Sequence, residues 1–488
     1  MKTTFSIIFF LLIFFLIQAQ DEKVRTDISQ YPSGPVTYSQ DTIMFRHIAY
    51  TLNNNGSINN IGKDIVLTPY KATIVENDLL KVTVVPGFGG RILSIIYKPT
   101  NHELLYQNSL ATPFAGGDIF YYDWLMIWGG IFPTFPESEH GKMWYLPWKS
   151  EIITATEDEF TLRMTRNDSI KPIDGIPPKQ FKYGRTDITV SATVRLKRGS
   201  AALHIDLEVE NTLNIPVDYE YWTCTTLAPG SKVGDTKSPA NTEIIAPIDE
   251  VHIPKRWEWM TKLELPTGKE GIYQYEKLAE FRNWSEMGIA YAAPQVMAGY
   301  WGVVNHENEV GVFRVADNKN STPGLKFWTW GVQSTASDLQ SPDIYRPYIE
   351  LWAGNSTEFF KPARLKGGEK KSWTETYLPT IGLAKFTKVN EYAAAFLKTT
   401  ESNGQQTLHA RVFSVEPSNN YDIILSVSGN EGVSKELLRK QWKPKLNAPS
   451  VFEVTKAITD LPPGKGEWKL TLLDTTNGKL LFEATILR

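Results

Sequence analysis

Apolar and polar residues alternate along much of the chain after residue 65, with the spacing of strands that bury one face. Four segments show the alternation most clearly: 79–85, 187–197, 202–211 and 310–315. They are rich in Val, Ile and Thr and are bounded by Gly, Pro, Asn or Asp, as strands are. Helical spacing is limited to a turn or two near 275–288 and 432–441. The pattern therefore predicts an all-β protein made of packed antiparallel sheets.

The length of the alternating region separates the chain into domains. Residues 66–385 are too many for a seven-stranded sandwich, and predict a large antiparallel double sheet of about fifteen strands or more. The polar stretch 401–407 and the lower tryptophan density beyond it indicate a boundary. We interpret 390–488 as a small immunoglobulin-like β-sandwich with a structural role, because "TTNGK" places Asn-Gly between two alternating runs and so predicts a hairpin. Residues 20–65 are expected to form a partly extended N-terminal arm.

The first twenty residues set the expected compartment. "MKTTFSIIFFLLIFFLIQAQ" has Lys2, an apolar run from Phe5 to Ile17 and the small residue Ala19. The run is shorter than the about twenty residues that a bilayer span requires, and the order of features is that of a cleaved secretory signal. We therefore expect residues 1–19 to be a signal peptide, with a mature protein that is periplasmic or extracellular and has no stable membrane span. A membrane anchor is the other interpretation.

Composition narrows the function further. Cys224 is the only cysteine, so no intramolecular disulfide forms, and stability must come from core burial. The 51 basic and 54 acidic residues give a net charge of −3 without a basic tract, which argues against a nucleic-acid partner. The histidines show no metal-ligand spacing, and we expect neither a metal nor a cofactor. Fifteen tryptophans exceed what a core requires and point to a binding surface.

The stretch "GGIFPTFPESEHGKMWYLPW", residues 129–148, combines the residue types of a sugar site. Its glycines and prolines exclude a helix or a regular ladder strand. His140 has an ordinary pKa near neutrality and can exchange a proton, while a tryptophan face can stack on the apolar side of a pyranose. Glu137 and Glu139 lie beside this histidine in the sequence. The stretch is therefore a candidate ligand loop.

This loop resembles that of the aldose 1-epimerase (galactose mutarotase) superfamily, which holds a histidine over the sugar ring. The matching residues are Gly129, Gly130, Pro133, Phe135, Pro136, His140, Gly141, Pro147 and Trp148. Four further segments match in order: 76–95, 209–230, 323–331 and 346–354. In an uncharacterised bacterial branch of the superfamily an arginine, here Arg91, directly follows the early Gly-Gly. The resemblance covers about residues 66–385 and implies a galactose mutarotase-like β-supersandwich there.

The resemblance also implies roles for individual residues. Glu350 stands at the position of the catalytic base and His140 at that of a catalytic histidine. The position of the second histidine, usually the acid that protonates the ring oxygen, is Trp222 here, so His140 or one of Glu137 and Glu139 would have to supply the proton. Six residues are candidate substrate-binding groups: Arg91, Glu137, Trp222, Lys326, Trp328 and Trp330.

Alternation in "KFWTWG" adds independent support for the last three of these residues. It places Lys326, Trp328 and Trp330 on one face of a strand. A lysine beside two tryptophans is unusual in a buried core, which predicts that this face lines an open cleft.

Three functions remain open. The first is an epimerase-type isomerase that acts on a sugar or a glycan end, which we favour. The second is a glycoside hydrolase or polysaccharide lyase, because two carboxylates beside a sugar also serve glycoside cleavage. The third is a noncatalytic carbohydrate-binding protein that has lost the second histidine.

Overall fold

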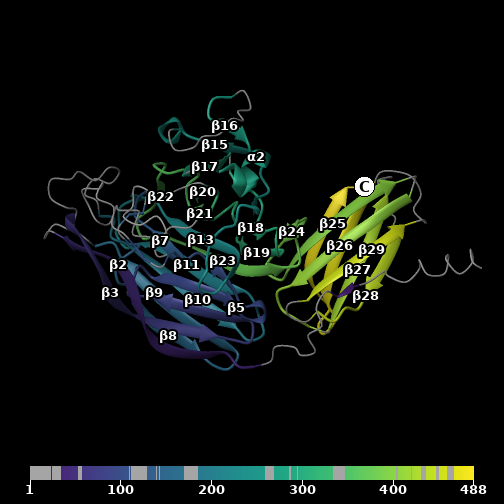
Figure 1. The fold of residues 1–488 in the computed structure, drawn as a ribbon, viewed down its shortest axis with the longest axis horizontal. Helices are drawn as coiled ribbons and strands as arrows, with labels where there is room; N and C mark the ends of the chain where they lie inside the picture. The colour runs from purple at the N-terminus through teal and green to yellow at the C-terminus, as the bar shows by residue number, and fades with distance from the viewer. Residues whose placement is uncertain are drawn as a thin grey trace, which may run out of the picture. The chain divides into compact units, whose positions relative to one another are not determined.

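The computed structural model describes two compact units, Pro32–Pro379 and Thr380–Arg488, the latter together with Met1–Tyr31 (Figure 1). Within them the described residues are 23–24, 34–52, 58–108, 110–111, 129–138, 140–141, 143–169, 185–258, 269–284, 287–293, 295–332, 347–402, 405–418, 420–429, 436–446, 450–458 and 466–487. The expected signal peptide, residues 1–19, and Glu139 lie outside these ranges. No helix within them is long and apolar enough to cross a membrane.

The first unit contains a large and a smaller antiparallel sheet. In the described part, the large sheet has the order β16 (Ile272–Gln274), β15 (Glu250–His252), β17 (Gly288–Ala293), β20 (Gly324–Trp330), β21 (Tyr348–Gly354), β13 (Trp222–Lys232), β6 (His102–Leu105), β5 (Arg91–Tyr97), β4 (Leu80–Val85), β3 (Ile58–Glu76) and β2 (Thr37–Leu52), with β7 (Ile131–Thr134) paired to β13 and β5. The smaller sheet has the order β14 (Thr242–Ile245), β18 (Tyr300–Asn305), β19 (Val310–Val315), β23 (Lys370–Ile381), β11 (Leu203–Asn211), β10 (Ile188–Lys197), β9 (Glu159–Asn167) and β8 (Lys149–Ala155).

Short elements complete this unit. Strand β12 (Val217–Tyr219) pairs with β22 (Ala363–Leu365). The described helices are α2 (Tyr275–Ala279) and the 3-10 turns η1 (Lys98–Thr100), η3 (Lys255–Trp257) and η4 (Phe281–Asn283). The predicted double sheet is confirmed, and helix α2 lies where a helical turn was expected.

The second unit is a β-sandwich with its own core. Its described strands form one sheet of β1 (Lys23–Val24), β29 (Val451–Ile458), β26 (Gln405–Ser414), β25 (Ala393–Ser402) and β24 (Lys388–Val389), and another of β28 (Glu436–Trp442), β27 (Tyr421–Gly429), β30 (Gly466–Asp474) and β31 (Lys479–Leu487). The predicted hairpin is confirmed: Gly478 has a φ of 70°, and β30 pairs with β31 across the turn. Residues 436–442 are a strand and not a helical turn, because pairing with β27 overrides their helix-forming composition.

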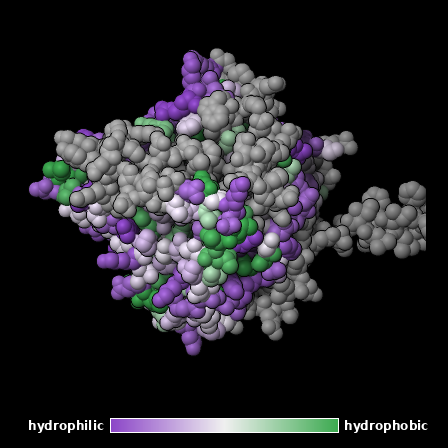
Figure 2. All heavy atoms as spheres, turned by 60° about the vertical axis from the view of Figure 1, so that its left-hand side comes forward, coloured by the Kyte–Doolittle hydropathy of each residue, from purple (hydrophilic) through white to green (hydrophobic). Residues whose placement is uncertain are grey.

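The N-terminal part of the chain enters the large sheet earlier than expected. Strands β2 and β3 pair from Thr37 opposite Glu76 to Leu52 opposite Ile58. The described residues of the expected arm are therefore mostly sheet. Side chains of Met44, Ile65 and Leu67 on this hairpin are exposed. In Figure 2 the described residues on the side that comes forward are mostly hydrophilic, with separate hydrophobic patches.

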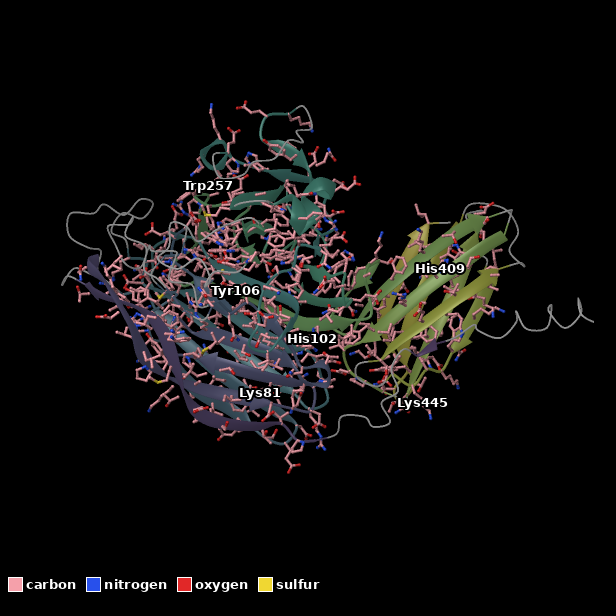
Figure 3. The ribbon with its side chains drawn as sticks, viewed as in Figure 1. Lys81, His102, Tyr106, Trp257, His409 and Lys445 are labelled. Carbon is pink, nitrogen blue, oxygen red and sulfur yellow. The ribbon has the colours of Figure 1, made fainter. Side chains whose placement is uncertain are left out.

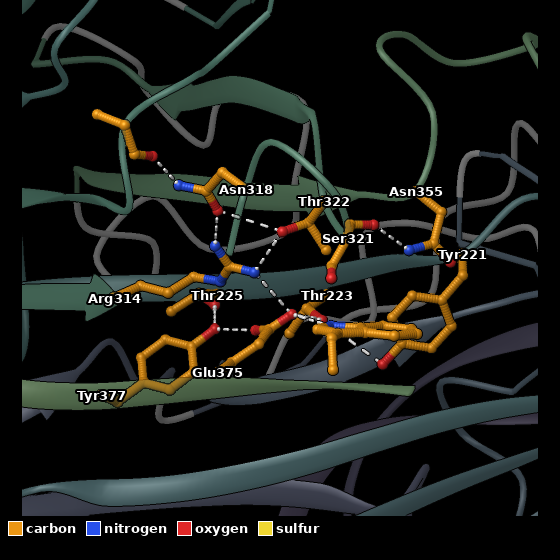
Figure 4. A network of polar contacts seen from close by, with 12 residues as sticks. Tyr221, Thr223, Thr225, Arg314, Asn318, Ser321, Thr322, Asn355, Glu375 and Tyr377 are labelled. Atoms are coloured by element: carbon orange, nitrogen blue, oxygen red, sulfur yellow. Dashed lines mark hydrogen bonds and ion pairs between the residues drawn. The ribbon is translucent and has the colours of Figure 1, made fainter. Parts of the chain in front are cut away.

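A buried polar network joins the two sheets of the first unit (Figure 4). Nη2 of Arg314 on β19 lies 2.9 Å from Oε1 of Glu375 on β23, and both side chains are almost fully buried. Thr223 on β13 donates to the same oxygen at 3.0 Å, and Tyr377 donates to the other at 2.9 Å. Burial alone would raise the pKa of Glu375, but the Arg314 charge and these hydrogen bonds outweigh it and lower the pKa. The carboxylate is therefore charged and fully engaged.

We predict that Glu375→Gln lowers the free energy of unfolding by about 3–5 kcal/mol, because it leaves the Arg314 charge buried without a counter-charge. Urea denaturation followed by tryptophan fluorescence measures the change. The double variant Arg314→Met/Glu375→Gln should lose less stability than Glu375→Gln alone, since no unpaired charge remains. A double variant as unstable as the single one would contradict this account.

Candidate functional site

The central strands of the large sheet bring the predicted residues onto one face. In the register of β20 with β21, Trp328 lies opposite Glu350, and Lys326 lies opposite Trp352. Strand β13 pairs with the other side of β21 and places Cys224 opposite Trp352. The predicted alternation on β20 is therefore confirmed, and it aligns Lys326 with the row that holds Glu350.

The indole of Trp352 is the point at which three ionisable side chains meet. Its Nε1 donates a hydrogen bond to Oε2 of Glu350 at 2.7 Å. Nζ of Lys326 lies 3.5 Å from the centroid of the indole, and the His140 ring centroid lies 5.2 Å from it. The structure thus places Glu350, His140 and Lys326 around one aromatic residue, which we call the Trp352 site.

The surroundings of Glu350 shift the pKa of its carboxyl group. Loss of water raises its pKa, while the Lys326 charge and hydrogen bonds from Trp352, Tyr348 and Cys224 oppose the shift. The Tyr348 hydroxyl donates to Oε1 at 3.3 Å. A carboxylate with a raised pKa takes up a proton more readily than an ordinary glutamate, as a general base must.

His140 is half-buried, and its ring lies edge-on to the Trp352 indole from the loop. Gly141, with a φ of 65°, allows the loop to pass so close that a Cβ there would lie 2.2 Å from the Phe135 carbonyl oxygen. Burial, with the nearby charges of Lys326 and Arg91, holds the pKa of His140 well below its usual value. The imidazole is therefore neutral at pH 7, and its Nδ1 finds no hydrogen-bond partner within the described ranges. This nitrogen is itself buried.

Arg91 braces the loop through backbone carbonyl groups. It donates hydrogen bonds to the carbonyl oxygens of Gly129, at 2.5 Å, and Trp144, at 3.2 Å. Its guanidinium lies between the rings of Phe88 and Phe132, at 4.6 and 4.0 Å. Burial lowers its pKa to about 9. The predicted binding residue thus holds both ends of the His140 loop.

The predicted stacking residues are enclosed, which corrects the expectation of an open face. The exposed fractions of Lys326, Trp328 and Trp330 are 3%, 6% and 7%. Trp328 and Trp330 stack on each other with centroids 5.8 Å apart. The lysine can be buried here because aromatic faces accommodate its ammonium group: the Phe359 ring centroid lies 4.4 Å from Nζ of Lys326.

Two further predicted residues are buried as well. Trp222 has no exposed surface, and a Cβ at Gly354 or Gly324 would lie 2.5 or 2.8 Å from its indole. Its Nε1 lacks a hydrogen-bond partner among the described residues. Glu137 is also buried, in the loop that carries His140. Trp222 therefore fills the space left by Gly354 on β21, the adjacent strand, and Gly324 on β20, the strand beyond it.

Sequence reasoning missed Trp352, Tyr348 and Phe359 as members of this cluster. The first two follow the period of two from Glu350, so the strand pattern could have placed them on its face. Phe359 lies beyond the strand, where no periodicity applies. Within the described ranges, no three His, Cys, Asp or Glu side chains gather as metal ligands.

Comparison with known proteins adds information on the fold. A family model described as a domain of unknown function (DUF5107) matches residues 56–161, which include Arg91 and His140. The structure of a TPR-domain containing protein from Parabacteroides distasonis matches with a TM-score of 0.55 and 18% identity, over 71% of this chain and 56% of that one. This chain thus spans little more than half the length of that relative.

Several other matching structures are galactose mutarotase-like proteins, the group that the sequence motifs resemble. One from Clostridium acetobutylicum has a TM-score of 0.44 and 11% identity, over 64% of this chain and 96% of that one. A galactose mutarotase related enzyme from Lactobacillus acidophilus has a TM-score of 0.41 and 12% identity, over 64% and 99%.

We predict that Gly354→Ala lowers the free energy of unfolding by about 1–3 kcal/mol, because the new methyl group overlaps the Trp222 indole. In a Trp222→Leu background the same change should be smaller, since the overlap is gone. Gly299→Ala is the control, with its Cβ at an ordinary 3.4 Å from the nearest atom. If Gly354→Ala lowers the free energy of unfolding equally in both backgrounds, its effect does not arise from contact with Trp222.

Proposed function

We propose that the protein is an exported, carbohydrate-active isomerase of the aldose epimerase type, which interconverts the anomers of a sugar or of a glycan end at the Trp352 site. The observation that carries the proposal is the convergence of Glu350, Lys326 and His140 on the Trp352 indole. Ring opening at an anomeric carbon needs one group that accepts a proton and one that donates a proton. The cluster supplies both.

The proposed reaction assigns one step to each group. The carboxylate of Glu350 takes the proton of the anomeric hydroxyl while the bond between C1 and the ring oxygen breaks. The ring oxygen receives a proton from the ammonium of Lys326, and the open-chain aldehyde rotates about its C1–C2 bond before it closes again. Reversal of both transfers restores the enzyme. His140, neutral because of its lowered pKa, orients the sugar by a hydrogen bond.

The assignment of the acid departs from the expectation for His140. A histidine whose pKa lies well below its usual value carries no proton to donate as imidazolium at pH 7. Lys326 lies on the same face as Glu350, and its charge opposes the rise in the carboxyl pKa that burial causes. A lysine thus takes the place of the second histidine in this proposal.

Noncatalytic sugar binding is the second candidate. The tryptophan at position 222 favours it, because an indole cannot protonate a ring oxygen as the second histidine of the superfamily would. Hydrolysis or elimination has less support, since the contacts described around Trp352 include one carboxylate, that of Glu350. Proton NMR of the anomeric region, recorded with a panel of sugars, distinguishes isomerisation, cleavage and binding.

We predict that Glu350→Gln slows anomer exchange by about a hundredfold or more, because the amide cannot accept the proton. Glu276→Gln, at an exposed glutamate, is the matched control, and this variant should exchange anomers at the wild-type rate. The wild-type rate should fall on acidification with a midpoint above the pKa of about 4.3 of an ordinary glutamate, since burial raises the pKa of Glu350. A rate that Glu350→Gln leaves intact would remove the base from the mechanism.

A further prediction separates the two candidate acids. Lys326→Met should slow exchange by about a hundredfold, whereas His140→Phe should cost less and weaken binding instead. Lys319→Met, at an exposed lysine, is the control. Full activity in Lys326→Met together with its loss in His140→Phe would identify the histidine as the acid.

A further inference from the structure

A second group of side chains adjoins the Trp352 site and is not used in the proposed reaction. It consists of Arg256 and Trp257 in η3 and Phe360 after β21, and we call it the rim. Trp257 and Phe360 are half-buried and pack against the same hydrophobic cluster as Trp352. Figure 3 labels Trp257. The rim is thus attached to the site but partly open to solvent.

Phe359 connects the rim to the site. Its ring centroid lies 5.5 Å from that of Trp352 and 6.2 Å from that of Phe360. Phe360 has a φ of +65°, a left-handed conformation that a bulky residue rarely adopts and that strains the backbone. The two consecutive rings are inclined at 76°, with Phe359 buried and Phe360 half-exposed. The strained backbone therefore presents one aromatic ring outward beside the site.

Arg256 stacks on that outward ring. Its guanidinium carbon lies 4.7 Å from the Phe360 centroid. The side chain is exposed, and no ion pair to a described carboxylate holds it. A guanidinium that stacks through its face keeps its N–H groups at the edges, where they can donate to oxygen atoms of a ligand.

A hydrogen bond and an ion pair fix the turn that carries the two phenylalanines. Nδ1 of His252 on β15 hydrogen-bonds Oε1 of Glu358 at 2.6 Å. Nζ of Lys361 lies 2.9 Å from the other carboxylate oxygen. The turn is therefore bound to the strand that leads into η3, which holds the three rim residues in place.

We propose that the rim is a sugar-binding subsite that receives the next units of a glycan chain whose end occupies the Trp352 site. The proposal rests on the proposed function, namely that a sugar binds at Trp352. Half-exposed aromatic rings offer apolar faces for pyranoses, and Arg256 offers donors for their hydroxyl groups. The ligand is then an oligosaccharide, with its end unit at Trp352 and the next units at the rim.

Calorimetric titration and anomeric NMR with matched sugars test this subsite. The probes are glucose, galactose and xylose, and the linear trisaccharides maltotriose, cellotriose, galactotriose and xylotriose. For the sugar that binds, the trisaccharide should bind wild-type protein at least about tenfold more tightly than its monosaccharide, about 1.4 kcal/mol. Trp257→Ala and Arg256→Gln should each bring this ratio toward one. Arg282→Gln, at another exposed arginine, is the control and should keep the ratio.

The outcomes separate the two proposals. A wild-type ratio near one, or a ratio that neither rim variant changes, would overturn the subsite while anomer exchange could still stand. A trisaccharide preference that depends on the rim, without any exchange, would support the subsite and refute the isomerase. Binding of none of these sugars would overturn both. Trp257→Ala removes a packed ring and could disturb folding. Arg256→Gln changes an exposed side chain, so the test remains valid if Trp257→Ala does not fold.

Discussion

The buried ion pair between Arg314 and Glu375 is the constraint around which the first unit is arranged. Two charges without water are stable only where hydrogen bonds complete their coordination. Here Asn318 and Thr322 accept from the guanidinium, while Thr223 and Tyr377 donate to the carboxylate. These partners come from both sheets, so the network fixes how one sheet faces the other. An apolar core would tolerate sliding that this set of bonds does not.

The same network determines what the large sheet presents on its other face. Thr223 and Thr225 on β13 point into the network, where Thr225 bonds the Tyr377 hydroxyl at 2.9 Å. Because strand residues alternate, Trp222, Cys224 and Thr226 must then point toward the Trp352 site. A register shift of one residue on β13 would exchange the side chains on its two faces. The electrostatics between the sheets thus sets the register of the strand that adjoins Trp352.

The period of two explains why much of this architecture could be predicted from the sequence. It locates strands such as 310–315 and the shared face of Lys326, Trp328 and Trp330, because side-chain direction is a local property. Enclosure of that face is not local. It depends on Phe359, which follows β21 along the chain, and on the loop that Arg91 holds through two carbonyl oxygens. Similarly, Glu436–Trp442 became a strand only because β27 supplies its hydrogen bonds.

The residue at position 222 distinguishes this chain from the superfamily that its motifs resemble. In the superfamily that the motifs resemble, a histidine stands here. The Trp222 indole lies over Gly354 and Gly324, which face each other on adjacent strands, and any side chain there would collide with it. A histidine at 222 is smaller than this indole and would leave the space over the two glycines partly empty. Lys326 stands two residues beyond Gly324 on the same strand, so the glycine that accommodates the indole and the proposed proton donor belong to one short segment. Strand β20 thus contributes twice to the cluster: Gly324 leaves room for the Trp222 indole of β13, and Lys326 places its ammonium group on the Trp352 ring.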